Sequence, residues 1–191
     1  FIHYMKSYRV FNVEQIEGLP ENYYLKPEQP SELEEMERLP LADSFIVGTG
    51  ADIRYGGDRA FHSSCGDFIQ IPYMEAFKTN HSYYATILHE LTHWTKAENR
   101  LDRDLGGIHK GDTGYAKEEL VAELGAAFLS VDLGVIPDIK GNHAAYIASW
   151  LKVLKKDKKA IFRAAAQAQR AADYLHGLQA EEIIEQQGLA A

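Results

Sequence analysis

The clearest pattern in the chain is the recurrence of apolar residues every three or four positions in two segments of its central part. The first segment begins at Ser82, and its apolar positions are Tyr84, Ile87, Leu88, Leu91 and Trp94. The second covers residues 115–133, and its apolar positions are Leu120, Leu124, Ala127, Phe128 and Val131. This spacing predicts two amphipathic helices, and Gly134 is expected to end the second one.

Short β-prone runs separated by turns of Gly, Ser and Asp precede the first predicted helix. Such runs are typical of a β meander. The strands are expected at residues 45–47, 51–55, 60–62 and 68–71, after a separate strand at residues 8–13. Further along, the pattern predicts a short helical turn at 74–79, a loop at 99–114, and two or three helices between 142 and 187. The expected fold class is therefore α+β, with a small antiparallel sheet packed on the first helix and additional C-terminal helices.

The chain is expected to form one domain preceded by an N-terminal strap. Residues 21–40 are rich in proline and acidic side chains, which predicts a linker and a short helix capped by Ser31. The predicted boundaries are residues 1–40 for the strap and 41–191 for the main domain with its C-terminal helical annex. Because the chain begins with Phe1 rather than methionine, it is expected to be a fragment of a longer protein.

Composition and charge narrow the range of functions. With 191 residues, of which 46% are hydrophobic, the chain can bury a full core without disulfides. With a net charge of −8, the protein is not expected to bind nucleic acid by phosphate neutralisation alone. The negative charge is also too small and too dispersed to favour mimicry of DNA. No segment approaches the roughly 20 apolar residues of a spanning helix, so no membrane partner is expected. The single cysteine, Cys65, excludes an internal disulfide framework and a cysteine-based zinc site, and it fits a cytoplasmic location.

The first predicted helix carries the sequence His89-Glu90-Leu91-Thr92-His93. Residues four apart project from the same helix face, so the two imidazoles can bind one cation with Glu90 beside them. Zinc suits imidazole ligands, and it keeps a position for water when the protein supplies three ligands. The pattern therefore predicts a Zn²⁺ cofactor, preferred over manganese or cobalt, and hydrolysis of peptide bonds with Glu90 as the general base.

A third ligand must come from outside this motif. Glu119 and Glu123 share one face of the second predicted helix, and either could bind the metal. His109, in the glycine-rich loop between the two helices, is the rival candidate. The glutamate pair resembles the arrangement in thermolysin-like and related gluzincin enzymes. That resemblance implies that Glu119 is the ligand and that Glu123 orients a ligand histidine, while the reverse assignment stays open.

Longer stretches of the chain also resemble a known family. The resemblance is carried by residues 83–95, 100–104 and 115–129, with flanking similarity at 8–18 and 146–172. These stretches are similar to the C-terminal zincin-like metallopeptidase domain of ArdC-type antirestriction proteins and TraC-type conjugative primases. Nearly the whole chain is covered by this resemblance.

The resemblance implies a zincin-like fold in a cytoplasmic protein, encoded on a plasmid or mobile element, that protects incoming DNA from restriction. Its partners would be a peptide or protein substrate, and single-stranded DNA bound through an N-terminal domain absent from this chain. The alternative interpretation is a non-catalytic module in which the metal only joins two helices. Such a module would act in DNA protection or conjugative transfer by binding DNA or protein.

Overall fold

The computed structural model describes residues 16–18, 20, 37–105, 113–136, 150–151, 154–155 and 157–188. The chain divides into two compact units, residues 1–35 and 36–191, and all of the labelled elements lie in the second. The helices are α1 (Pro40–Gly48), the 3-10 helix η3 (Met74–Ala76), α2 (Asn80–Trp94), α3 (Thr113–Asp132) and α5 (Ala160–Gly188). The strands are β1 (Asp52–Tyr55), β2 (Phe61–Ser63) and β3 (Phe68–Ile71). This unit is α+β, as the sequence predicts.

The two helices predicted from apolar periodicity are confirmed as α2 and α3, and the last three predicted strands are confirmed as β1, β2 and β3. The strand expected at residues 45–47 is wrong, because these residues belong to α1. Pro40 opens that helix, where its fixed φ suits the first turn. Ala42, Phe45 and Ile46 are its buried residues, and their spacing is helical. An apolar run of three residues was too short to distinguish the two structures.

The sheet is mixed rather than wholly antiparallel. Its strand order is β1-β3-β2, with β1 parallel and β2 antiparallel to β3. Because β2 pairs with the far side of β3, β3 is the central strand. Two of its side chains, Ile69 and Ile71, are fully buried. Among the described strands, β1 and β2 form the two edges of the sheet, and β2 is the edge strand that contacts α2.

Several expectations lie outside the described residues. These are the strand at residues 8–13, almost all of the helix capped by Ser31, and the loop that contains His109. Within the segment expected to hold further helices, α5 and the helical residues 150–151 and 154–155 are described. The boundary between strap and main domain at residue 40 stays a prediction. None of the described helices is long and apolar enough to span a membrane.

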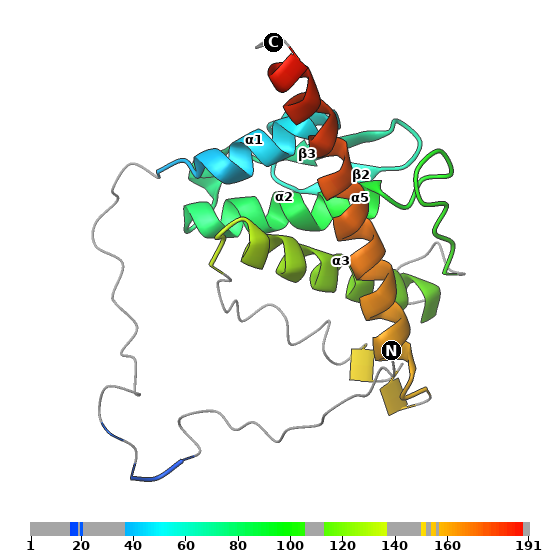
Figure 1. Cartoon of the computed structure of the whole chain (residues 1–191). Coiled ribbons are helices and arrows are strands. Elements are labelled where there is room, and N and C mark those ends of the chain that lie inside the picture. The colour runs from blue at the N-terminus through cyan, green and yellow to red at the C-terminus, as the bar shows by residue number, and fades with distance from the viewer. Residues whose placement is uncertain are drawn as a thin grey trace. The chain divides into compact units, whose positions relative to one another are not determined.

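Helix α2 occupies the centre of the core. Its side chains Tyr84, Leu88 and Leu91 are fully buried, and they belong to one cluster with residues of β3, α3 and α5. In Figure 1, α3 runs alongside α2 and α5 crosses both, in agreement with the contacts among these helices. Thr79 caps the start of α2: its hydroxyl accepts from the Ser82 N–H at 3.0 Å, and the Ser82 hydroxyl accepts from the Thr79 N–H at 3.4 Å.

Helices α3 and α2 are in close contact at Gly125. A Cβ atom at this position would lie 2.6 Å from Cγ2 and 2.7 Å from Oγ1 of Thr92, which is fully buried on α2. A side chain at residue 125 would therefore push the two helices apart. Glycine is required here by contact between helices, since no turn or positive φ is involved.

We expect the substitution Gly125→Ala to destabilise the domain by about 1–3 kcal/mol, because it overpacks the contact with Thr92. Gly177→Ala is the matched control on α5, where a Cβ atom would meet nothing within 4 Å. The control should gain up to about 1 kcal/mol from helix propensity. Urea unfolding of both variants measures the difference, and equal stabilities would show that the helices are not in close contact at Gly125.

Candidate metal centre

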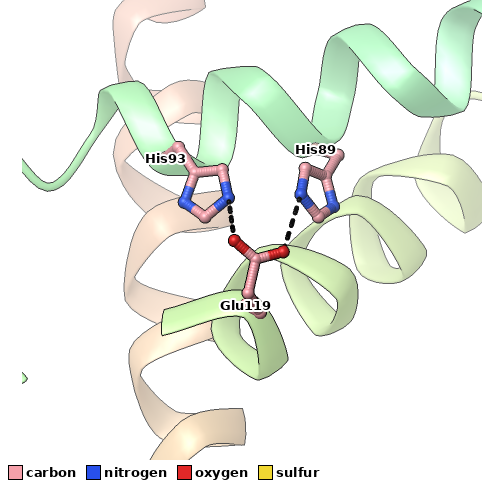
Figure 2. Close-up of side chains that lie close together, drawn as sticks. All are labelled: His89, His93 and Glu119. Atoms are coloured by element: carbon pink, nitrogen blue, oxygen red, sulfur yellow. Dashed lines mark ion pairs between the residues drawn. The ribbon is translucent and has the colours of Figure 1, made fainter. Parts of the chain in front are cut away.

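Two histidines of α2 and one glutamate of α3 converge across the contact between these helices. Ligand atoms of His89, His93 and Glu119 all lie within 4.8 Å of one another, as Figure 2 shows. His89 Nε2 is 3.8 Å from Glu119 Oε2, and His93 Nε2 is 3.5 Å from Glu119 Oε1. Two imidazoles and one carboxylate are a donor set that zinc accepts while keeping one position open. These residues therefore fit the cation that the sequence predicts.

Each histidine also has a carboxylate beside its other ring nitrogen. His93 Nδ1 lies 3.1 Å from Glu118 Oε1, and His89 Nδ1 lies 3.8 Å from Glu123 Oε1. A carboxylate at this position fixes the tautomer and the orientation of an imidazole whose other nitrogen binds a metal. Glu123 thus lies on the far side of the His89 ring from Glu119. The assignment of Glu119 as ligand, with Glu123 in support, stays a prediction that this geometry favours.

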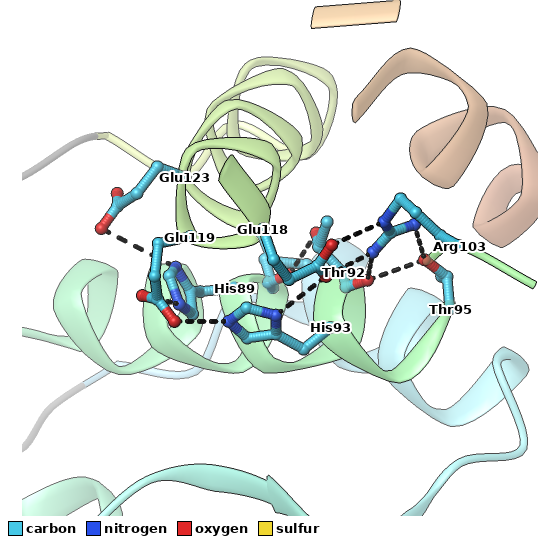
Figure 3. A network of polar contacts seen from close by, with 9 residues as sticks. His89, Thr92, His93, Thr95, Arg103, Glu118, Glu119 and Glu123 are labelled. Carbon is cyan, nitrogen blue, oxygen red and sulfur yellow. Dashed lines mark hydrogen bonds and ion pairs between the residues drawn. The ribbon is translucent and has the colours of Figure 1, made fainter. Parts of the chain in front are cut away.

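Arg103 holds Glu118 in place, and neither role was predicted from the sequence. The guanidinium donates from Nε to Glu118 Oε2 at 2.9 Å and from Nη2 to Glu118 Oε1 at 2.8 Å. It also donates to Thr95 Oγ1 at 3.0 Å and to the carbonyl of Thr92 at 2.9 Å (Figure 3). Arg103 is buried, so a two-pronged ion pair of this kind is only weakly screened by water. Its only sequence signal was its place in the 100–104 stretch of the family resemblance.

The electrostatics of the cluster favour a positive charge between its carboxylates. Burial opposes ionisation of Glu118, but the hydrogen bonds from Arg103 and His93 outweigh it and lower the pKa of this carboxyl to about 2. Burial likewise opposes protonation of His93, yet its hydrogen bonds with Glu118 and Glu119 raise its pKa to about 9. A bound cation would take the place of this proton, because metal ligands must be deprotonated.

Glu90 faces the same cavity from the motif helix and is buried. Burial, with the nearby charge of Glu119 as a further contribution, raises the pKa of its carboxyl above the ordinary value. The backbone of His62 on β2 partly offsets this rise in the pKa of Glu90. The side chain predicted to act as the general base therefore lies between the histidine pair and the edge strand.

The cavity has a volume of about 500 Å³ and lies between α2, α3 and β2. Its lining residues are Ala60, Phe61, His62, Ser64, His89, Glu90, His93, Lys96, Tyr115, Glu118 and Glu119. A second cavity of about 360 Å³ shares His62, Ser64, Lys96 and Glu118 with the first. The two cavities are therefore adjacent, and each has a volume within the range of known ligand sites.

His62 and Lys96 line both cavities and were not identified from the sequence as site residues. The His62 side chain is only 3% exposed, and its Nε2 has no hydrogen-bond partner among the described residues, with Asp67 Oδ1 3.8 Å away. Burial and the charge of Lys96 lower the pKa of His62 to about 4, so its imidazole is neutral at pH 7. His62 has no recognisable spacing from the motif, because the fold alone brings β2 to α2. Lys96 lies three residues after His93, but a lysine at that position carries no signal of a metal site.

Comparisons with known proteins agree with this architecture. A family model described as zincin-like metallopeptidase matches residues 40–167. The chain is 41% identical over 178 residues to uncharacterized protein y4eC of Sinorhizobium fredii, and 43% identical over 180 residues to DNA primase TraC of Escherichia coli. Each match covers 93% of this chain, which spans 56% of y4eC and 16% of TraC.

Two crystal structures of the antirestriction protein ArdC from plasmid R388, one bound to Mn(II) and one metal-free, match with a TM-score of 0.66. Both are 44% identical to this chain and cover 93% of it, while it covers 63% and 62% of theirs. The fold, the family model and these relatives agree with one another. The chain therefore belongs to the zincin-like metallopeptidase family, in which ArdC-type antirestriction proteins and TraC-type primases are its relatives.

Proposed function

We propose that this domain hydrolyses peptide bonds with the help of one zinc ion held by His89, His93 and Glu119. The observation that carries the proposal is the convergence of these three side chains within 4.8 Å on the wall of a cavity. When bound, the ion would supply Lewis acidity, which lowers the pKa of water and polarises a carbonyl oxygen. Mn(II) is bound in the ArdC structure, but two imidazoles with one carboxylate suit zinc.

Glu90 is the general base of the proposed reaction. Burial raises the pKa of Glu90 toward neutral pH. A base whose pKa is near the working pH can both accept a proton and return it effectively. Glu90 would take a proton from the attacking water as the bond from oxygen to the carbonyl carbon forms. It would then deliver that proton to the amine nitrogen as the carbon–nitrogen bond breaks, which returns Glu90 to its ionised form.

Among the described strands, β2 has one unpaired edge, and an extended peptide substrate would pair with it. The central strand β3 cannot take this role, because both of its edges are already paired. Ala60, Phe61 and His62 line the cavity that contains the candidate metal ligands. A peptide lying along β2 would therefore present its backbone to Glu90 and the histidine pair.

The names of the relatives suggest a biological setting. ArdC is an antirestriction protein and TraC is a DNA primase, which supports a role in protecting or processing transferred DNA. Because the chain spans only part of each relative, single-stranded DNA would be bound by a domain outside it. The alternative is that the metal only joins α2 to α3 and that the domain acts by binding DNA or protein.

Metal content tests the ligand assignment. Protein purified without added metal should contain one equivalent of zinc by elemental analysis, and His89→Ala or Glu119→Ala should lose it. Glu123→Ala should keep the stoichiometry, with an affinity about 10- to 100-fold lower, because this side chain only orients His89. If Glu123→Ala instead loses the zinc while Glu119→Ala keeps it, the two glutamates exchange roles.

The pair formed by Arg103 and Glu118 is tested by Arg103→Lys, which keeps the charge but loses the fork that binds both carboxylate oxygens. We expect zinc affinity to fall at least about 10-fold because Glu118 no longer holds His93 in place. Arg163→Lys is the control, since that arginine forms an ion pair with exposed Asp157 on the surface. Competition with a chelator measures both affinities, and circular dichroism checks the fold. An unchanged affinity in Arg103→Lys would refute the positioning role.

Glu90→Gln separates catalysis from a structural role of the metal. This change removes the base but keeps the size of the side chain, so zinc content and fold should be preserved. Cleavage of a fluorogenic peptide library should fall at least about 100-fold. Protection of DNA during conjugative transfer should be lost with it in the full-length protein. Retained protection by a zinc-loaded Glu90→Gln protein would favour the non-catalytic alternative.

A further inference from the structure

The cavity that contains the candidate metal ligands is lined by two nitrogen groups without a partner among the described residues. The Lys96 ammonium is a donor, and His62 Nε2 donates in one of the two neutral tautomers of the ring. His62 Nε2 is buried and has no hydrogen-bond partner among the described residues. Lys96 is half-buried, and the described part of the chain offers its ammonium neither a hydrogen bond nor an ion pair. A buried donor without a partner is energetically unfavourable. A ligand that accepts from both groups would recover that cost.

The backbones of Lys96 and His62 are held beside the candidate metal ligands. The Lys96 N–H donates to the carbonyl of His93 at 3.0 Å, and the Lys96 carbonyl accepts from the Arg103 N–H at 2.9 Å. His62 is paired with Ile69 in the sheet. The turn that follows β2 is clamped, since Arg100 donates to both carboxylate oxygens of Asp67. Backbone contacts therefore hold both residues at the wall of the cavity.

The balance of charges in the cavity permits the binding of an anion. The carboxylate of Glu118 is neutralised by Arg103, and that of Glu119 would be neutralised by the metal. Among the described residues that line this cavity, Glu90 is then the carboxylate that opposes the charge of Lys96. Asp67, whose Oδ1 lies 3.8 Å from His62 Nε2, is paired with Arg100. The further acidic residues nearby are exposed to solvent and line only the second cavity; they are Glu98, Asp102 and Asp104.

We propose that His62 and Lys96 bind a carboxylate of the peptide substrate next to the bond that is cleaved. This inference rests on the proposed peptidase function and adds a preference for acidic substrates. A carboxylate has one charge and two acceptor oxygens, which match one ammonium and one imidazole N–H. A phosphodiester chain fits less well, because the protein carries a net charge of −8 and the second cavity is lined by acids.

The test uses two pairs of hydroxamates that bind a zinc ion and differ only in the charge of one group. N-acetylglutamyl and N-acetylglutaminyl hydroxamate compare a side-chain carboxylate with its amide. Succinate monohydroxamate and its amide compare a chain-terminal carboxylate in the same way. Calorimetry on the zinc-loaded wild type should show that, in one of the two pairs, the acid binds at least about tenfold more tightly than its amide. The pair that shows this preference tells whether the bound carboxylate is that of a side chain or of a chain terminus.

Lys96→Met should abolish this preference while leaving binding of the neutral hydroxamates unchanged, and His62→Phe should reduce it. Lys78→Met is the matched control, since Lys78 is exposed and lies outside both cavities, and it should keep the preference. Equal binding of acid and amide by the wild type, or a preference that survives Lys96→Met, would overturn the inference. So would competition by a thymidine oligonucleotide that depends on Lys96, because the site would then bind phosphate.

These outcomes are separable from failure of the proposed function. If zinc and the neutral hydroxamates bind but the carboxylate brings no gain, the peptidase proposal stands and only the preference for acids is lost. If zinc does not bind to the wild type, both proposals fall together.

Discussion

The close contact between α2 and α3 is the constraint on which the candidate metal centre depends. Imidazoles from one helix and carboxylates from the other can share a cation only if the two backbones stay at a fixed, short separation. Gly125 permits that separation because any side chain there would collide with Thr92. The buried Leu88 and Leu91 hold α2 against the rest of the core. The metal site is thus a consequence of helix packing as much as of its ligand residues.

Carboxylates gathered beside that contact carry an electrostatic cost, which Arg103 offsets. Removing a carboxylate from water is unfavourable unless a partner satisfies both of its oxygens. The guanidinium does this for Glu118, and its remaining donors reach the last turn of α2 at Thr92 and Thr95. Carbonyl oxygens at a helix C-terminus favour a cation. One side chain therefore anchors the carboxylate that orients His93 to the helix that carries His93.

Local sequence patterns predicted the helices well and the arrangement of strands less well. Helices α2 and α3 followed from apolar periodicity, and the histidine pair followed from the spacing of four within one helix. The parallel pairing of β1 with β3 could not be read from the order of strands along the chain. Arg103 and His62 were missed as members of the site for the same reason, since tertiary contacts bring them there. The grouping of Glu119 with the histidines agrees with expectation, whereas its role as ligand stays a prediction.

The segment that follows α2 connects the two sides of the cavity. Arg103 from this segment fixes the side formed by Glu118 and His93, as described above. Arg100 fixes the opposite side: it stacks 4.0 Å above the ring of Trp94, donates to the Trp94 carbonyl at 2.6 Å, and binds Asp67 in the turn between β2 and β3. Two arginines a few residues apart thus tie both the imidazoles and the edge strand to the end of one helix. The motif on α2 supplies the candidate metal ligands, but the residues after it determine where the edge strand β2 lies relative to them.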